Sequence, residues 1–303
     1  MVEVTADCLG QVEEGRVMDF QTYAKAHGVL IEHVLDDSRW HRVPTTTHPR
    51  KKNGAYRHCG THAHVQDHAT MLEPALWTPD AEQAAKIDHA GIAQRAAKAA
   101  LQIRQDQEAA AKKAAWILHQ CKTEKHPYLE AKGFPEEHAN VWADGEVRKL
   151  CIPMRADGQL VGLQTISDQP PFEKRFLYGQ RTRDAVYVMD NKGRKWFCEG
   201  YATGLSVRAA LQALKVRYTL IVCFSASNLL NAAKNHGDGF VVADKDHETV
   251  LAPDEGGMGW KVATETGLAF WKAPEAGMDF NDFARKHGVF RASQELKGLL
   301  MKK

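Results

Sequence analysis

Residues 195–246, KWFCEGYATGLSVRAALQALKVRYTLIVCFSASNLLNAAKNHGDGFVVADKD, decide the fold class of this chain. Apolar runs such as TLIVC and FVVA alternate there with segments of helical spacing, and a further apolar run, GLAFWKA, follows at residues 267–273. Apolar runs of this kind suit strands that are covered on both faces. The alternation predicts an α/β fold with a mostly parallel sheet and right-handed crossovers, whose ligand site lies at the carboxyl ends of the strands.

Acidic residues follow three of these strands. Glu199 comes after KWFC, Asp244 and Asp246 come after FVVA, and Asp279 follows the last strand in MDFNDF. Each acid alone is explained as well by a helix cap or a solvated turn. Three acidic clusters at one edge of a sheet would repel one another without a cation, and carboxylates are the ligands that Mg²⁺ prefers. Together they favour a metal site.

The length of 303 residues exceeds what a single core usually organises, so two domains are expected. Residues 1–80 contain short alternating segments and one helix at 20–27, which predicts a small α+β module. Residues 81–122 are rich in Ala, Gln, Lys and Glu and predict one long connector helix. Residues 123–193 contain two alternating runs joined by Ala-Asp-Gly, a strong hairpin signal. Residues 194–303 form the α/β part.

The charge balance restricts the function. The chain has 40 Lys and Arg against 38 Asp and Glu, a formal net charge of +2, which excludes indiscriminate coating of nucleic acid but leaves room for a local basic groove. The six cysteines are scattered singly, so no zinc is expected and a reducing compartment is favoured. No apolar run is long enough to span a membrane, and the N-terminus has no leader pattern, so we expect a cytoplasmic protein without a membrane partner.

Glu199-Gly200-Tyr201 after a strand, the Asp244-x-Asp246 pair after a later strand and a further acid at Asp279 resemble the Toprim domain, the catalytic fold of bacterial-type primases, topoisomerases and certain nucleases. The stretches LCIPMRADGQLVGLQTIS, EKRFLYG and CEGYATGLSV, together with HPYLEAKGF and RWHRVPTTTHPRKKNGAY, resemble primases of phages and plasmids. The likeness covers residues 17–290. It implies that 194–303 is a Toprim catalytic domain and 123–193 the N-terminal subdomain of a primase core.

The resemblance implies a DNA primase, a nucleotidyltransferase that joins ribonucleoside triphosphates into short RNA primers on a single-stranded DNA template. It implies two divalent ions, Mg²⁺ or Mn²⁺, with Asp244 and Asp246 as ligands and Asp279 as a further acid. Glu199 would be a ligand or a general base near the attacking oxygen. Such ions neutralise charge on the attacking and leaving oxygens. A replicative helicase on a separate chain is a further expected partner.

Basic residues are candidates for binding the triphosphate and the template. Arg155, Lys174 and Arg175 match basic positions of the primase core, with ordinary solvated charges as the alternative. The cations Arg50, Lys51 and Lys52 near Tyr56 suit contact with a nucleic-acid backbone, and a plain solvated turn explains them equally well. Template choice would come from the 17–80 module or another chain, or would not be strict.

Two other functions are compatible with the sequence. A Toprim nuclease would use the same acids to cut nucleic acid, and a non-catalytic replication accessory protein would bind single strands or a helicase. The chain also departs from related primases, which often have an acid where Ser225 stands in Phe224-Ser225-Ala226. This departure puts in doubt any role carried over to that loop.

Overall fold

The computed structural model describes residues 18–71, 73–85, 88–244, 257–275 and 277–301. The chain divides into two compact units at residue 100. We call them the N-terminal and the C-terminal unit, and each is described by itself. Among the described residues, no helix has the length and apolar character that crossing a membrane requires.

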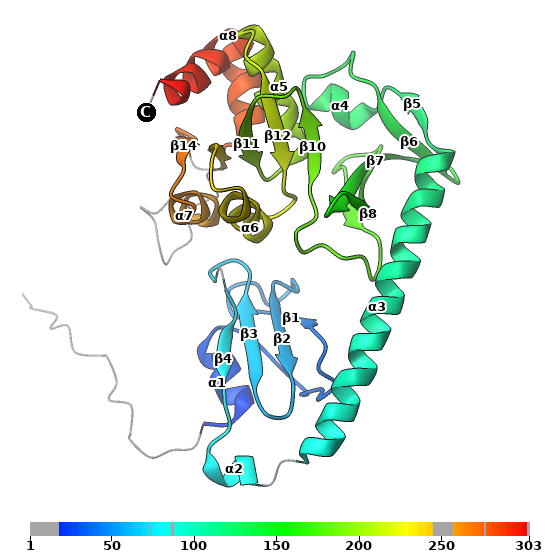
Figure 1. The fold of residues 1–303 in the computed structure, drawn as a ribbon, viewed down its shortest axis with the longest axis vertical. Coiled ribbons are helices and arrows are strands. Elements are labelled where there is room, and N and C mark those ends of the chain that lie inside the picture. Colours follow the sequence, from blue (N-terminus) through cyan, green and yellow to red (C-terminus); the bar gives the residue numbers. More distant parts are fainter. Residues whose placement is uncertain (1–17, 72, 86–87, 245–256, 276, 302–303) are drawn as a thin grey trace, which may run out of the picture. The chain divides into compact units, whose positions relative to one another are not determined.

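The N-terminal unit is a four-stranded antiparallel sheet with a helix packed on it (Figure 1). The strands pair in chain order: β1 (His41–Val43), β2 (Gly54–His58), β3 (Ala63–Asp67) and β4 (Ala75–Trp77). The helix α1 (Phe20–Ala26) begins at Asp19, whose side chain accepts a hydrogen bond from the Thr22 amide. Phe20 and Ala24 pack against Tyr56 in the core. The predicted α+β module is therefore present.

The structure differs from the prediction of one long helix over residues 81–122. Two helices occur there, α2 (Ala81–Ala85) and α3 (His89–Gln120). Asp88 separates them, because its carboxylate accepts a hydrogen bond from the Gly91 amide at 3.0 Å and so caps α3. Only one end of α3 is well packed in the C-terminal unit, through the buried residues Ala114 and Ile117.

The C-terminal unit contains two sheets (Figure 1). The first, the antiparallel sheet, has its strands in chain order: β5 (Lys122–Glu124), β6 (Ala139–Asp144), β7 (Val147–Ala156), β8 (Gln159–Ser167) and β9 (Lys174–Phe176). The predicted hairpin is confirmed as β7 and β8. Its two turn residues, Asp157 and Gly158, have φ values of 52° and 75°, as a two-residue hairpin turn of type I′ requires.

The second sheet, the mixed sheet, has the order β10-β12-β11-β13-β14. Its strands are β10 (Tyr187–Asp190), β11 (Arg194–Cys198), β12 (Tyr218–Val222), β13 (Phe240–Ala243) and β14 (Ala269–Lys272). The last four are mutually parallel, as predicted, and β10 is antiparallel to β12. The strand β10 joins this sheet although it lies before residue 194, where we expected the α/β part to begin.

Four helices cover the mixed sheet: α5 (Tyr201–Ala213), α6 (Ala226–His236), α7 (Gly257–Glu265) and α8 (Phe280–Leu300). The helices α5 and α8 pack together, and α6 and α7 pack together, so the two pairs lie on opposite faces (Figure 1). The core between α5, α8 and the sheet includes Trp196, Val242 and Phe280. The chain as a whole is thus mixed α/β, with one mostly parallel sheet beside two antiparallel ones.

Candidate functional site

The connections of the mixed sheet create a crevice between β11 and β13. The chain runs from β11 through α5 to β12 on one side, and then through α6 to β13 on the other side of β11. Helices that leave neighbouring strands towards opposite faces open a crevice at the carboxyl ends of those strands. Glu199 directly follows β11, and Asp244 directly follows β13. The topology therefore places these two acids at the same switch point.

Asp279 reaches the crevice from the beginning of α8. It is the N-cap of this helix, and its Oδ1 accepts a hydrogen bond of 2.7 Å from the Asp282 amide. Capping, the alternative explanation for an acid at this position, is thus a real role of Asp279. The residue also lines the pocket with Glu199 and Asp244, so the cap positions the carboxylate as well.

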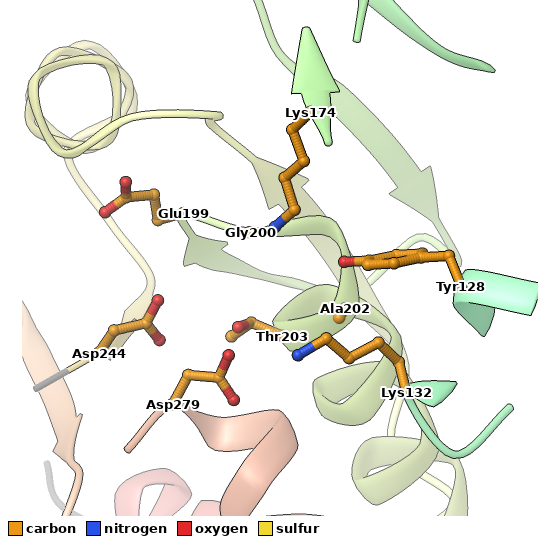
Figure 2. A pocket seen from close by; sticks show the side chains of 9 residues that line it. All are labelled: Tyr128, Lys132, Lys174, Glu199, Gly200, Ala202, Thr203, Asp244 and Asp279. Carbon is orange, nitrogen blue, oxygen red and sulfur yellow. The ribbon is translucent and has the colours of Figure 1, made fainter. Parts of the chain in front are cut away.

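Figure 2 shows the pocket in which these acids meet. Three carboxylates lie along one side and two lysines and a tyrosine along the other, with the start of α5 between them. The residues that line it are Tyr128, Lys132, Lys174, Glu199, Gly200, Ala202, Thr203, Asp244 and Asp279. All of them belong to the C-terminal unit, and they come from both of its sheets and their connections.

The helix α4 (Pro127–Ala131) presents Tyr128 and Lys132 to the pocket. It begins at His126, whose Nδ1 accepts from the Tyr128 amide, and Pro127 occupies its first position. It ends in a Schellman motif, in which the amide of Gly133 (φ 88°) donates to Glu130 and that of Phe134 to Leu129. Residues four apart lie on one face of a helix, so Tyr128 and Lys132 point the same way.

Asn281 joins three segments of the site. Its side-chain amide donates to the carbonyl of Lys132 at 2.8 Å and to Oγ of Ser206 at 2.9 Å, and the residue is fully buried. The end of α4, the middle of α5 and the first turn of α8 are therefore connected through one side chain. We assign Asn281 a positioning role, since it fixes Lys132 relative to the helix that begins at Asp279.

The first turn of α5, whose backbone amides have no partners within the helix, lines the pocket through Gly200, Ala202 and Thr203. Its N-cap is Gly200, which has no side chain to accept hydrogen bonds from these amides. The described caps of α4, α6 and α8 instead use the side chains of His126, Ser225 and Asp279. The start of a helix has partial positive charge and favours anions. This end of α5 lies open to an anionic ligand.

The surroundings of the pocket shift the pKa values of Lys174 and Tyr128. Lys174 is an exposed residue of the edge strand β9, and its ammonium end points into the pocket (Figure 2). Partial burial of that end lowers the pKa of Lys174, as does Lys132, and the three pocket carboxylates oppose this shift. Burial, with Asp279 nearby, raises the pKa of the Tyr128 hydroxyl, which stays protonated and able to donate.

Two thiols lie beneath the acids. Cys198 is the last residue of β11 and Cys223 follows β12, and both are fully buried. Burial raises the pKa of both thiols, and the neighbouring carboxylate of Glu199 adds to this. A protonated, buried thiol is a poor nucleophile. The acids and lysines, not these cysteines, are therefore the candidates for reactive groups of the site.

The structure brings together four of the residues that the sequence singled out: Glu199, Asp244, Asp279 and Lys174. Asp246 lies outside the described residues. Arg155 and Arg175 do not line the pocket. Arg155 donates to the carbonyl of Gly158 in the hairpin turn, and Arg175 forms an ion pair with Glu173.

The three cations at residues 50–52 lie between β1 and β2 in the N-terminal unit and are exposed. Sequence reasoning missed Tyr128, Lys132 and Thr203. A signal for the first two existed in HPYLEAKG, where proline after a capping residue and a final glycine mark a short helix with Tyr128 and Lys132 on one face. Thr203 follows the predicted strand-end motif Glu199-Gly200 by only three residues.

The pocket carboxylates suit a hard divalent ion in their chemistry. Among the residues that the structure describes, no three His, Cys, Asp or Glu side chains lie close enough together to hold one ion. Mg²⁺ is often bound by only one or two carboxylates, with water and substrate phosphates completing its shell. One or two of the carboxylates Glu199, Asp244 and Asp279 therefore suffice for such an ion, without a closed cage of all three.

Comparison with known proteins adds no assignment. No model of a known protein family matches this chain, and no solved structure matches it.

Proposed function

We propose that the chain is a DNA primase of phage or plasmid type, which joins ribonucleoside triphosphates into short primers on single-stranded DNA. The observation that supports this best is the convergence of Glu199, Asp244 and Asp279 with Lys174 in one pocket. The resemblance to Toprim primases rests on the order of these acids and on their positions after strands. We propose accordingly that the mixed sheet and its helices are a Toprim domain.

The proposed reaction needs two divalent ions, Mg²⁺ or Mn²⁺, for which Asp244 and Asp279 are candidate ligands in the pocket. When bound, such an ion neutralises charge on the phosphate and on the oxygens that attack and leave. Asp246, the third proposed ligand, follows Asp244 by two residues. Single-stranded DNA and ribonucleotides are the proposed substrates, and a replicative helicase on another chain stays a prediction.

Two residues of the pocket are candidates for proton transfer and for stabilisation of the leaving group. Glu199 lies at the end of β11, and its carboxylate is suited to accept the proton of an attacking 3′-hydroxyl. Its backbone is held in place, because the carbonyl of Glu199 accepts a hydrogen bond of 2.9 Å from the Phe224 amide. Lys174, on the opposite wall, is suited to neutralise the phosphate that becomes the leaving group.

Primer synthesis on single-stranded templates with labelled ribonucleotides tests this function. We expect Glu199→Gln and Asp244→Asn to lower the yield by about 100-fold or more, since each removes a pocket charge with little change of shape. The matched controls are Glu146→Gln and Asp157→Asn, which change exposed turn residues of the antiparallel sheet. These controls should retain wild-type activity and all four variants should unfold at similar temperatures.

Other results of the same assay would contradict the proposal. Degradation of the DNA with Mg²⁺ or Mn²⁺, without any oligoribonucleotide product, would identify a nuclease that uses these acids. If primer synthesis persists in both pocket variants, Glu199 and Asp244 are not catalytic and the assignment of the site is wrong. An absence of any reaction, combined with binding to single strands that the variants do not affect, would identify an accessory protein.

A further inference from the structure

The hydroxyl of Tyr128 is a hydrogen-bonding group that nothing in the described protein satisfies. The residue is 1% exposed, and its oxygen is buried without a hydrogen-bond partner among the described residues. Leaving a buried polar group unpaired is unfavourable. Figure 2 shows the hydroxyl directed into the pocket. It is thus placed to donate to an acceptor atom of a ligand rather than to the protein.

Two ammonium groups point into the same part of the pocket. Lys174 Nζ lies 5.7 Å from the centre of the Tyr128 ring, and Lys132 lies one turn after Tyr128 on α4 (Figure 2). The two lysines come from different elements, β9 and the end of α4, so their convergence is a property of the fold. Two neighbouring cations repel unless an anion lies between them.

The first turn of α5 also lines the pocket, beside the Tyr128 hydroxyl and the two ammonium groups (Figure 2). Gly200, Ala202 and Thr203 line the pocket together with the lysines. The helix has 13 residues, long enough for its amino end to favour an anion. The amides of α5, two ammonium groups and one phenol are all donors, and together they match the oxygens of phosphate groups.

We propose that Tyr128, Lys132, Lys174 and the first turn of α5 form one subsite for the terminal phosphates of a nucleoside triphosphate. The choice of a triphosphate rests on the proposed function, whereas the binding of a polyphosphate anion does not. Two ammonium groups, a phenol and the amino end of a helix in one pocket suit a chain of phosphates better than a single phosphodiester of a nucleic-acid backbone. Carboxylates lie on the opposite wall of the pocket. A polyphosphate that extends to them would need a divalent ion, because the negative charges would otherwise repel one another.

Calorimetric titration of the full-length chain with inorganic tripolyphosphate, in the presence of a chelator, tests the subsite without any reaction. We expect Lys132→Met and Lys174→Met each to weaken binding about tenfold or more, because each removes a charge-assisted contact. We expect Tyr128→Phe to weaken binding about three- to tenfold through the loss of one hydrogen bond. This last variant retains the ring and its packing on Phe172, so it should fold normally.

The matched controls are Lys122→Met on β5 and Tyr178→Phe, because both change exposed residues outside the pocket. They should bind tripolyphosphate as the wild type does. Wild-type affinity in Tyr128→Phe and in both lysine pocket variants would overturn the subsite. If Lys132→Met fails to fold, Lys132→Arg retains the charge and should bind within about threefold of the wild type.

Two further arms separate this inference from the proposed function. Glu199→Gln should lower primer synthesis by about 100-fold or more. It should not weaken tripolyphosphate binding without metal, because it removes a nearby negative charge. If the chain binds tripolyphosphate but makes no primer, the result would support the subsite and contradict the primase proposal. A DNA oligonucleotide without terminal phosphates should not displace tripolyphosphate, and displacement would show that the subsite binds the backbone instead.

Discussion

At the scale of single residues, His126 shows how one side chain controls part of the pocket. Its Nδ1 accepts from the Tyr128 amide at 3.2 Å, and its Nε2 donates to the carbonyl of Arg148 at 3.3 Å. The neutral imidazole with its proton on Nε2 satisfies both contacts. A second proton would occupy Nδ1 and remove the cap of α4, the helix that presents Tyr128 and Lys132.

This arrangement predicts a dependence of stability on pH. Burial lowers the pKa of His126 below its ordinary value of 6.5, so between the two values the unfolded chain binds more protons than the folded chain. The free energy of unfolding then rises with pH in this window and falls as the pH drops below 6.5. Urea unfolding at about pH 7.5 and about pH 5 should show a smaller decrease for His126→Asn, which retains a capping oxygen.

Exposed His138 provides the comparison for this measurement. The variant His138→Asn should lose as much stability as the wild type between the two pH values. An equal loss in His126→Asn, His138→Asn and the wild type would show that His126 does not control the acid side of the stability curve.

At the scale of elements, the loop after β12 shows the structural role of Ser225. Ser225 is the N-cap of α6, and its side chain accepts from the Asn228 amide at 3.3 Å. Asn228 in turn donates to the carbonyl of Thr182 at 2.6 Å, which holds the segment before β10 against the helix. Serine and aspartate are about equally good at an N-cap, so an aspartate at position 225 would preserve the start of α6.

We therefore predict that Ser225→Asp leaves the free energy of unfolding within about 0.5 kcal/mol of the wild type, whereas Ser225→Ala lowers it by about 1 kcal/mol. Chemical denaturation followed by circular dichroism measures both. Ser227→Ala, at an exposed position in the same first turn, is the control and should have a small effect. A Ser225→Ala variant as stable as the wild type would show that the cap does not stabilise α6.

At the scale of the whole molecule, the pocket belongs to the C-terminal unit alone. Every residue that lines it lies between Tyr128 and Asp279, and the buried contacts of α3 with this unit, Ala114 and Ile117, lie after the division at residue 100. The cations of residues 50–52 belong to the other unit. Anion binding and any contribution of those cations to template binding should thus be separable.

A fragment of residues 101–303 should fold and bind tripolyphosphate within about threefold of the full chain. Circular dichroism with thermal unfolding and calorimetric titration would check both statements. A fragment that is unfolded, or that is folded but binds much more weakly, would show that the N-terminal unit is required for the pocket.

Much of the secondary structure follows from local chemistry and was therefore predictable. The strands of the mixed sheet are short apolar runs, and the hairpin turn needs the left-handed conformations that Asp157 and Gly158 adopt. The break at Asp88 was missed because a single capping residue within a strongly helical composition gives little signal. The meeting of Glu199 with Asp244 was predictable as well, because the carboxyl ends of neighbouring parallel strands share one edge.

The strands, the caps and the acids at the strand ends follow from local sequence, since each depends on residues a few positions apart. Tyr128 and Lys132 face those acids because of contacts between segments that lie far apart in the chain. That placement depends on Asn281, which reaches a carbonyl 149 residues earlier in the chain, and on the packing of α4 against α5. Contacts over such separations leave no periodic pattern in the sequence, because they are selected by shape and hydrogen bonding in the folded core.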